Sequence, residues 1–244
     1  MSNTPGAVDE ATATTALYLV LSTLRHFSKA ERSLRAGTWK TPIALRDTHD
    51  LSTRTLGVLG LGGIGLRLAH LVHAFPMRVV YHSRRRVADA PSWCEYVESV
   101  EALCARSDVL SVHVPLRADT VGIVGEREIR AMQRGSVIVN TARGKVLDEE
   151  AVIRALEDGH VRGMSYAMPM TDVLSAQLAA VGLDVFPNEP QVNPRLFAFP
   201  QNTLLPHVGT HTQDTERRME VQALTNLRDF LLSGCGKDIV PELR

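Results

Sequence analysis

Cysteines, long apolar runs and net charge are scarce in this chain of 244 residues, and each shortage excludes a class of protein. Cys94, Cys104 and Cys235 have neither metal-ligand spacing nor the pattern of a disulfide framework. The 27 basic residues balance the 27 acidic ones, so charge favours neither a nucleic acid nor an anionic membrane as partner. No apolar run reaches the length of a transmembrane helix.

A targeting signal is also not expected, because MSNTPGAVDEATATT has the pattern of neither a signal peptide nor an arginine-rich transit peptide. Hydrophobic residues make up 44% and charged residues 22%, which is ordinary for a globular protein. We therefore expect a cytoplasmic protein in a reducing compartment. The length suits one large domain, or one domain and part of another.

Short runs rich in β-branched residues alternate with helical patterns along most of the chain. The runs are nearly continuous in apolar character, which is typical of strands covered on both faces. This alternation predicts an α/β fold with a doubly wound parallel sheet. The predicted strands are 55–61, 78–83, 108–115, 136–142, 181–186 and 203–207, and the predicted helices are 9–37, 64–75, 100–106, 126–134, 148–158 and 214–232.

The segment GVLGLGGIGLRLA places Gly60, Gly62 and Gly65 in G-x-G-x-x-G spacing between a predicted strand and a predicted helix. In this spacing the first glycine permits a tight turn, the second lets the backbone approach a pyrophosphate, and the third allows close packing. The helix N-terminus offers unpaired N–H groups to phosphates. An ordinary glycine-rich turn is the alternative, but the flanking elements favour a Rossmann-type dinucleotide-binding domain.

The end of the second predicted strand bears on the choice of cofactor. An NAD-preferring protein has an acidic residue here for the ribose 2′-hydroxyl, whereas this sequence reads YHSRRR from Tyr81 to Arg86. Guanidinium groups suit the 2′-phosphate of NADP. A solvated basic loop is the alternative reading, so NADP is favoured and NAD stays open.

Three later segments place a polar residue at the C-terminal edge of the predicted sheet, where ligands of such folds bind. Arg143 in VNTARG has the geometry to hold a carboxylate, and Glu189 in GLDVFPNEP has the charge to stabilise the imidazolium of His207 in LLPHVGT. Taken singly, each signal is weak, since a lone histidine or arginine is more often structural. Their combination with the glycine loop favours a redox site.

With these motifs, and with HVPL, the sequence resembles the D-isomer-specific 2-hydroxyacid dehydrogenases, especially the members similar to glyoxylate/hydroxypyruvate reductases, from about Asn3 to Arg244. The resemblance implies hydride transfer between NAD(P)H and a small 2-oxo acid. It implies Arg143 as substrate anchor, His207 as acid/base and Glu189 as its partner, and Asp184 next to the nicotinamide carboxamide. Further residues implied to line the cofactor groove are Gly63, Ile64, Ser83, Arg84, Pro115, Thr141, Ala142 and Gly209.

The sequence departs from the family in lacking the α/β segment that precedes the first helix and forms most of the substrate domain. We accordingly divide the chain into a helix packing on the cofactor domain (1–36), the NAD(P)-binding domain (37–211) and a C-terminal helix and tail (212–244). We expect the last helix to expose an apolar face. In the family that segment forms one wall of the cleft, which excludes water and positions the substrate. Without this wall we expect weak or no activity from this chain alone.

An apparent insertion, 164–180, separates the helix ending near Gly159 from the GLDV strand, where the family has only a few residues. It contains three methionines and neither lysine nor arginine. A surface loop is one interpretation, since loop closure costs little per added residue. Translated intron sequence is the other.

Two alternative functions remain beside the reductase. One is a non-catalytic dinucleotide-binding protein similar to the corepressors that share this fold and the same polar trio. The other is a truncated, inactive family member. By the same resemblance, a homodimer formed through the cofactor domain and the N-terminal helix is a further expectation.

Overall fold

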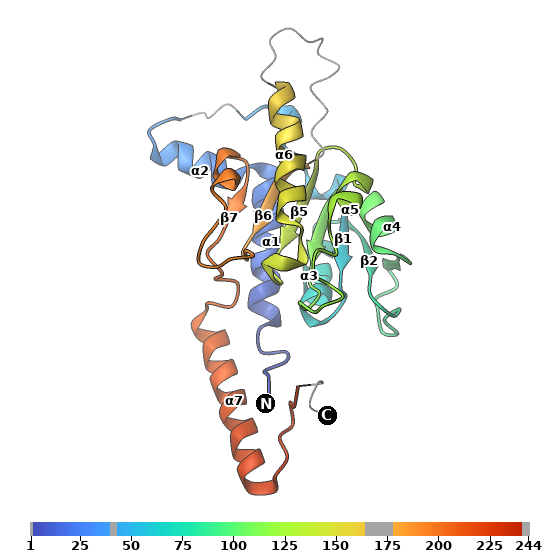
Figure 1. Cartoon of the computed structure of the whole chain (residues 1–244), viewed down its shortest axis with the longest axis vertical. Coiled ribbons are helices and arrows are strands. Elements are labelled where there is room, and N and C mark those ends of the chain that lie inside the picture. Colours follow the sequence, from blue (N-terminus) through green and yellow to red (C-terminus); the bar gives the residue numbers. More distant parts are fainter. Residues whose placement is uncertain (1, 40–42, 164–177, 241–244) are drawn as a thin grey trace.

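The computed structural model describes residues 2–39, 43–163 and 178–240 (Figure 1). Its centre is a parallel sheet of seven strands in the order β3-β2-β1-β4-β5-β6-β7. Strand β1 therefore lies between β2 and β4, which places the loops following these three strands next to one another. The strands are β1 (Thr55–Leu59), β2 (Arg78–His82), β3 (Cys94–Tyr96), β4 (Val109–Val112), β5 (Ser136–Asn140), β6 (Leu178–Leu183) and β7 (Thr203–Leu204).

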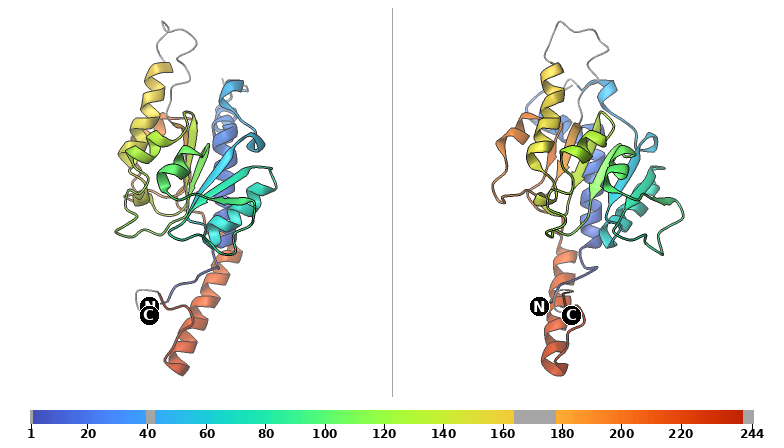
Figure 2. Two further views of the ribbon diagram at one scale, coloured as in Figure 1. Left: turned by 90° about the vertical axis from the view of Figure 1, so that its right-hand side faces the viewer. Right: turned by 45° about the vertical axis from the view of Figure 1, so that its right-hand side comes forward.

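Helices cover both faces of the sheet, as Figure 2 shows. On one face α1 (Asp9–Arg25) and α3 (Gly63–His73) bury side chains such as Leu19 and Leu68 against the strands. On the other face α4 (Val100–Ala105), α5 (Glu126–Ala131) and α6 (Glu149–Gly163) bury Leu103, Ile129 and Ile153. These two separate cores explain the continuous apolar character of the strands and confirm the predicted doubly wound fold.

The N-terminal helix is not continuous, contrary to the prediction. It breaks at His26, whose backbone is left-handed with φ of 55°, and the chain continues as α2 (Phe27–Arg35). The Ser22 hydroxyl is hydrogen-bonded to the hydroxyls of both Ser28 and Thr203, at 2.8 and 2.7 Å. These contacts hold the break against β7.

Strand β6 begins at Leu178, earlier than the predicted start at Val181, because Leu178 and Ala180 already pair with β5. The last part of the predicted insertion is therefore sheet, and both side chains are buried. Residues 164–177 lie outside the described residues, so the two interpretations of the insertion are not tested. The edge strand β3 was not predicted.

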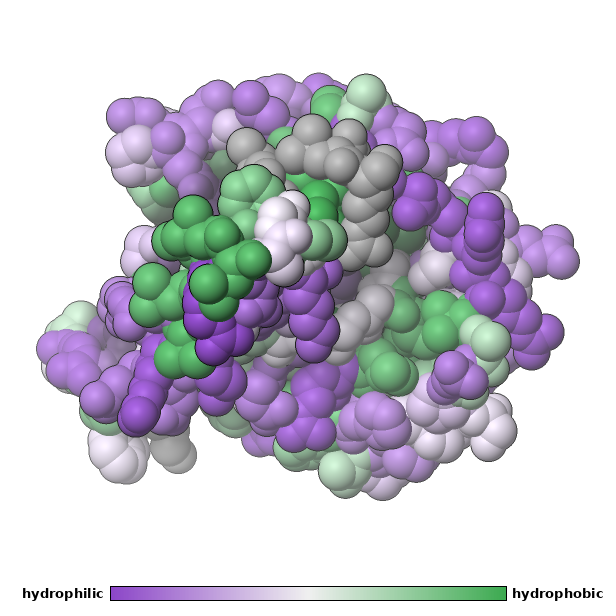
Figure 3. Space-filling model, turned by 90° about the horizontal axis from the view of Figure 1, so that it is seen from below, coloured by the Kyte–Doolittle hydropathy of each residue, from purple (hydrophilic) through white to green (hydrophobic). Residues whose placement is uncertain are grey.

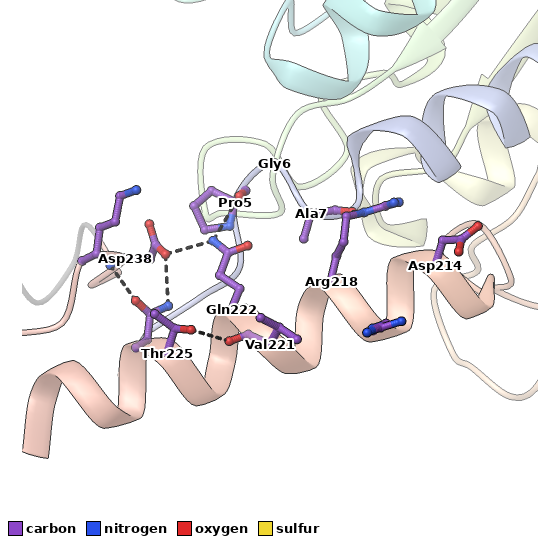
Figure 4. A pocket seen from close by; sticks show the side chains of 12 residues that line it. Pro5, Gly6, Ala7, Asp214, Arg218, Val221, Gln222, Thr225 and Asp238 are labelled. Atoms are coloured by element: carbon purple, nitrogen blue, oxygen red, sulfur yellow. Dashed lines mark hydrogen bonds between the residues drawn. The ribbon is translucent and has the colours of Figure 1, made fainter.

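Helix α7 (Gln213–Ser233) extends away from the sheet and is joined to both terminal segments. The Gln222 amide donates to the Pro5 carbonyl and to Asp238, at 3.2 and 2.9 Å, and Asn226 donates to Asp238 at 3.0 Å (Figure 4). A cavity of about 720 Å³ lies between α7 and the segment around Gly6.

The rest of α7 exposes an apolar surface, as predicted. Val221, Leu224 and Leu231 are 57%, 65% and 73% exposed, and hydrophobic side chains gather on this helix in the view from below (Figure 3). Within the described ranges, no helix combines the length and the apolar character needed to cross a membrane.

Candidate active site

The glycine loop joins β1 to α3 in a tight turn. Gly60 has a φ of 96°, which favours glycine, and its N–H donates to the His82 carbonyl at 2.8 Å. A side chain on Gly65 would press on the Gly60 carbonyl and come within 2.9 Å of Val58, so helix and strand pack closely there. A Cβ atom added to Gly62 would meet no atom within 4 Å apart from its chain neighbours, so the backbone here is open to a ligand. The loop therefore fits a pyrophosphate at the N-terminus of α3.

The loop after β2 forms the next part of the same edge. The Ser83 hydroxyl accepts a hydrogen bond from the Leu61 N–H at 2.9 Å and so fixes this loop to the glycine loop. Ser83, Arg84 and Arg85 line an open depression of about 520 Å³. A narrower cavity of about 90 Å³ continues from Ser83 and Arg84 toward Pro115 in the loop after β4.

Arg143 follows β5, where Asn140 shapes the turn. The Asn140 side chain accepts from the Ala142 N–H at 2.9 Å and donates to the Arg143 carbonyl at 3.0 Å. The Arg143 side chain is exposed, and its guanidinium contacts the Ala142 carbonyl at 2.6 Å. Next to it, the buried Thr141 hydroxyl has no hydrogen-bond partner within the described part of the chain. This free hydroxyl is a group that a bound cofactor would satisfy.

Glu189 and His207 form a hydrogen-bonded pair at the same edge. Glu189 Oε2 lies 2.7 Å from His207 Nδ1, while Glu189 Oε1 accepts from the Phe186 N–H at 2.8 Å. Partial burial works to raise the pKa of Glu189. Hydrogen bonds from His207 and Phe186 and the charge of Arg143 outweigh it and hold this pKa below its ordinary value. Glu189 is thus an ionised partner of His207, and Arg143 lies near enough for its charge to help lower the pKa of Glu189.

Asp184 fixes the loop that carries the histidine. The residue is 1% exposed, and its carboxylate accepts hydrogen bonds from the N–H groups of Val208 and Gly209, both at 2.8 Å. Burial raises the pKa of Asp184, although these two hydrogen bonds oppose the shift. They hold His207 in a left-handed conformation with φ of 56°, a strained geometry that often occurs at functional sites.

The structure thus brings the predicted polar trio, Arg143, Glu189 and His207, to the edge where the glycine loop also lies. Sequence reasoning missed Asp9, whose carboxylate lies directly against Gly63 at the start of α3. It also missed Arg117, which lines the narrow cavity together with Arg84. A basic residue two positions after Pro115 was visible in the sequence, but its proximity to Arg84 depends on the strand order.

Comparison with known proteins places these features in a family. The profile of the D-isomer specific 2-hydroxyacid dehydrogenase NAD binding domain matches residues 17–168. The chain is 40% identical over 242 residues to 4-methyl-2-oxopentanoate reductase A of Aspergillus oryzae, covering 99% of this chain and 68% of that protein.

Two solved structures show the same fold. A glyoxylate reductase from Paecilomyes thermophila has a TM-score of 0.88 and 41% identity, covering 100% of this chain and 68% of the other. The NADPH-dependent glyoxylate/hydroxypyruvate reductase of Sinorhizobium meliloti, in complex with NADP and malonate, has a TM-score of 0.83 and 32% identity, covering 99% and 70%. The chain therefore spans about two thirds of the length of these three relatives.

Proposed function

Because the chain belongs to the D-isomer-specific 2-hydroxyacid dehydrogenase family, we propose that it reduces a small 2-oxo acid with a nicotinamide dinucleotide. Glyoxylate and hydroxypyruvate are the proposed substrates, since two similar structures carry these names. The observation that carries the proposal is the 2.7 Å pair of His207 and Glu189 beside Arg143, at the edge that also holds the glycine loop.

The three side chains have distinct roles in this proposal. Arg143 binds the substrate carboxylate through its planar, two-pronged guanidinium and draws electrons from the neighbouring carbonyl. His207 donates a proton to the carbonyl oxygen as that oxygen gains negative charge. Glu189 accepts the Nδ1 hydrogen of His207, which orients the ring and stabilises its protonated form. The bound dinucleotide supplies the hydride.

We further propose a preference for NADP(H), with NAD(H) as the alternative. Ser83, Arg84 and Arg85 line the depression after β2 and supply hydrogen-bond donors and positive charge where a 2′-phosphate would lie. The relative from Sinorhizobium meliloti is described with NADP.

The test combines binding with turnover. NADPH and NADH are titrated onto the purified chain by calorimetry, and reduction of glyoxylate and hydroxypyruvate is followed by the loss of absorbance of the reduced cofactor. We expect His207→Asn to lower the reduction rate by at least about 100-fold and to change the dinucleotide Kd less than about twofold, because proton transfer alone is removed.

His70→Asn, an exposed histidine on α3, is the matched control and should retain the activity of the unmodified chain. Equal rates for His207→Asn and the unmodified chain would refute the assigned role. Tight dinucleotide binding without any turnover would instead favour one of the two alternatives, a non-catalytic dinucleotide-binding protein or a truncated, inactive family member.

A cytoplasmic homodimer completes the proposal. Tyr18, Phe27 and Leu34 on α1 and α2 are 44%, 46% and 54% exposed, an apolar surface on the helices for which a dimer contact is expected. Light scattering with size-exclusion chromatography would report the mass in solution, and a monomer at micromolar concentration would contradict the dimer.

A further inference from the structure

Arg117 lines the cavity at the proposed cofactor site from the loop after β4, which also carries Pro115, but the cofactor prediction did not include Arg117 itself. It follows β4, whereas Ser83 and Arg84 follow β2, and all three line the cavity of about 90 Å³. Leu59 and Ile123 form part of its apolar wall. The cavity thus combines a hydrophobic surface suited to an aromatic base with guanidinium groups from two separate loops.

The loop that carries Arg117 is held in place by its own hydrogen bonds. The Arg117 N–H donates to the Thr120 hydroxyl at 2.7 Å, and that hydroxyl donates to the Pro115 carbonyl at 2.7 Å. Thr120 is buried. The backbone is therefore fixed before any ligand binds, so the Arg117 side chain projects from a defined base.

Among the residues that the structure describes, the guanidinium of Arg117 also has no ionic partner. Several other arginines within the described ranges are paired, for example Arg106 with Glu95 at 2.6 Å. Within residues 2–39, 43–163 and 178–240, by contrast, neither Arg84 nor Arg117 has an ion pair or a hydrogen bond from its guanidinium, although Asp119 lines the same cavity. Two unpaired cations facing one cavity favour a dianionic ligand group.

We propose that Arg117 is a second specificity-determining residue for the 2′-phosphate of NADP(H), acting together with Arg84, which lines the same cavity. The inference rests on the proposed function, because it assumes a dinucleotide in the groove. A phosphate monoester carries close to two negative charges at neutral pH and three acceptor oxygens, so it accommodates two guanidinium groups at once. NADH lacks this group and gains nothing from either charge.

The experiment compares Arg117→Gln with the unmodified full chain by calorimetry, using NADPH, NADH, 2′,5′-ADP and 5′-AMP. We expect Arg117→Gln to raise the Kd for NADPH and for 2′,5′-ADP by roughly tenfold, the effect of losing charge-assisted hydrogen bonds. The Kd for NADH and for 5′-AMP should change less than about twofold. Raising the salt concentration should weaken NADPH binding less in the variant, since one screened charge is gone.

Arg217→Gln is the matched control. Arg217 lies on α7 and lines the cavity near Gly6, not the one that Arg84 and Arg117 line, so the substitution should leave all four affinities unchanged. A thermal melt of each variant confirms that the fold is retained.

Equal weakening of NADPH and NADH would overturn the inference, because it would mean that Arg117 stacks on the adenine. Unchanged affinity for both would overturn it as well. If the unmodified chain binds neither dinucleotide, the proposed function itself fails and the inference falls with it. The inference alone fails if the unmodified chain binds NADPH and Arg117→Gln does not weaken NADPH binding more than NADH binding.

Discussion

His113 makes the stability of the fold sensitive to acid. It follows β4, its Nε2 lies 2.8 Å from the Ser111 hydroxyl, and its Nδ1 is buried with no partner in the described part of the chain. Burial lowers the pKa of His113 to about 4, from an ordinary value of 6.5. The unfolded chain therefore takes up a proton near pH 6.5, while the folded chain takes it up only near pH 4.

The sign follows from this difference in proton uptake. The contribution of His113 to the free energy of unfolding is fully present above pH 6.5 and is lost as the pH falls toward 4. Each pKa unit corresponds to about 1.4 kcal/mol, so the loss between about pH 7.5 and pH 5 is about 2 kcal/mol. Because His113 as a whole residue is only partly buried, we expect a measured loss of about 1–2 kcal/mol.

Urea unfolding of the unmodified chain and of His113→Gln at the two pH values tests this reasoning. Glutamine places a side-chain amide near the Ser111 hydroxyl but does not titrate. The difference between the two proteins therefore isolates the effect of the His113 imidazole on the free energy of unfolding from the effects of all carboxylates. We expect the stability advantage of the unmodified chain to shrink by about 1–2 kcal/mol at the lower pH. Parallel pH profiles for the two proteins would refute the argument.

Three further substitutions test the site. Asp184→Ala leaves two backbone N–H donors without an acceptor, so urea denaturation should show a loss of about 2–4 kcal/mol, and an unchanged midpoint would argue against this anchoring role. Glu189→Gln removes the charge that stabilises the imidazolium, and stopped-flow assays should show a roughly 10- to 100-fold slower reduction; full activity would exclude that role. Gly65→Val places a side chain against the Gly60 carbonyl, so titration should show at least about tenfold weaker dinucleotide binding. Unchanged binding would mean that the glycine loop is an ordinary turn and does not hold the cofactor.

The sheet was predictable where strands are buried on both faces, because such strands are continuous apolar runs. Strand β5 (Ser136–Asn140) is buried at every position. The edge strand Cys94–Tyr96 has one buried residue among three and leaves no recognisable pattern. The break at His26 was missed because the apolar stripe continues from Leu24 to Phe27, and left-handed residues at helix ends are usually glycine.

The candidate site divides in a similar way. Arg143, Glu189 and His207 each follow a strand, so the rule that ligands bind at the C-terminal edge of a parallel sheet was enough to bring them together. Arg117 required the strand order as well. Its loop meets that of Arg84 only because β1 lies between β2 and β4, and sequence patterns do not state which strands are neighbours.

The position of α1 has a consequence for synthesis of the chain on the ribosome. This helix is made early, yet it packs against β5, β6 and β7, and its Ser22 bonds to Thr203, which is 181 residues later in the sequence. The part of its apolar side that faces these strands stays uncovered until they have been translated. During that interval the nascent chain offers a binding site for chaperones and an opportunity for aggregation.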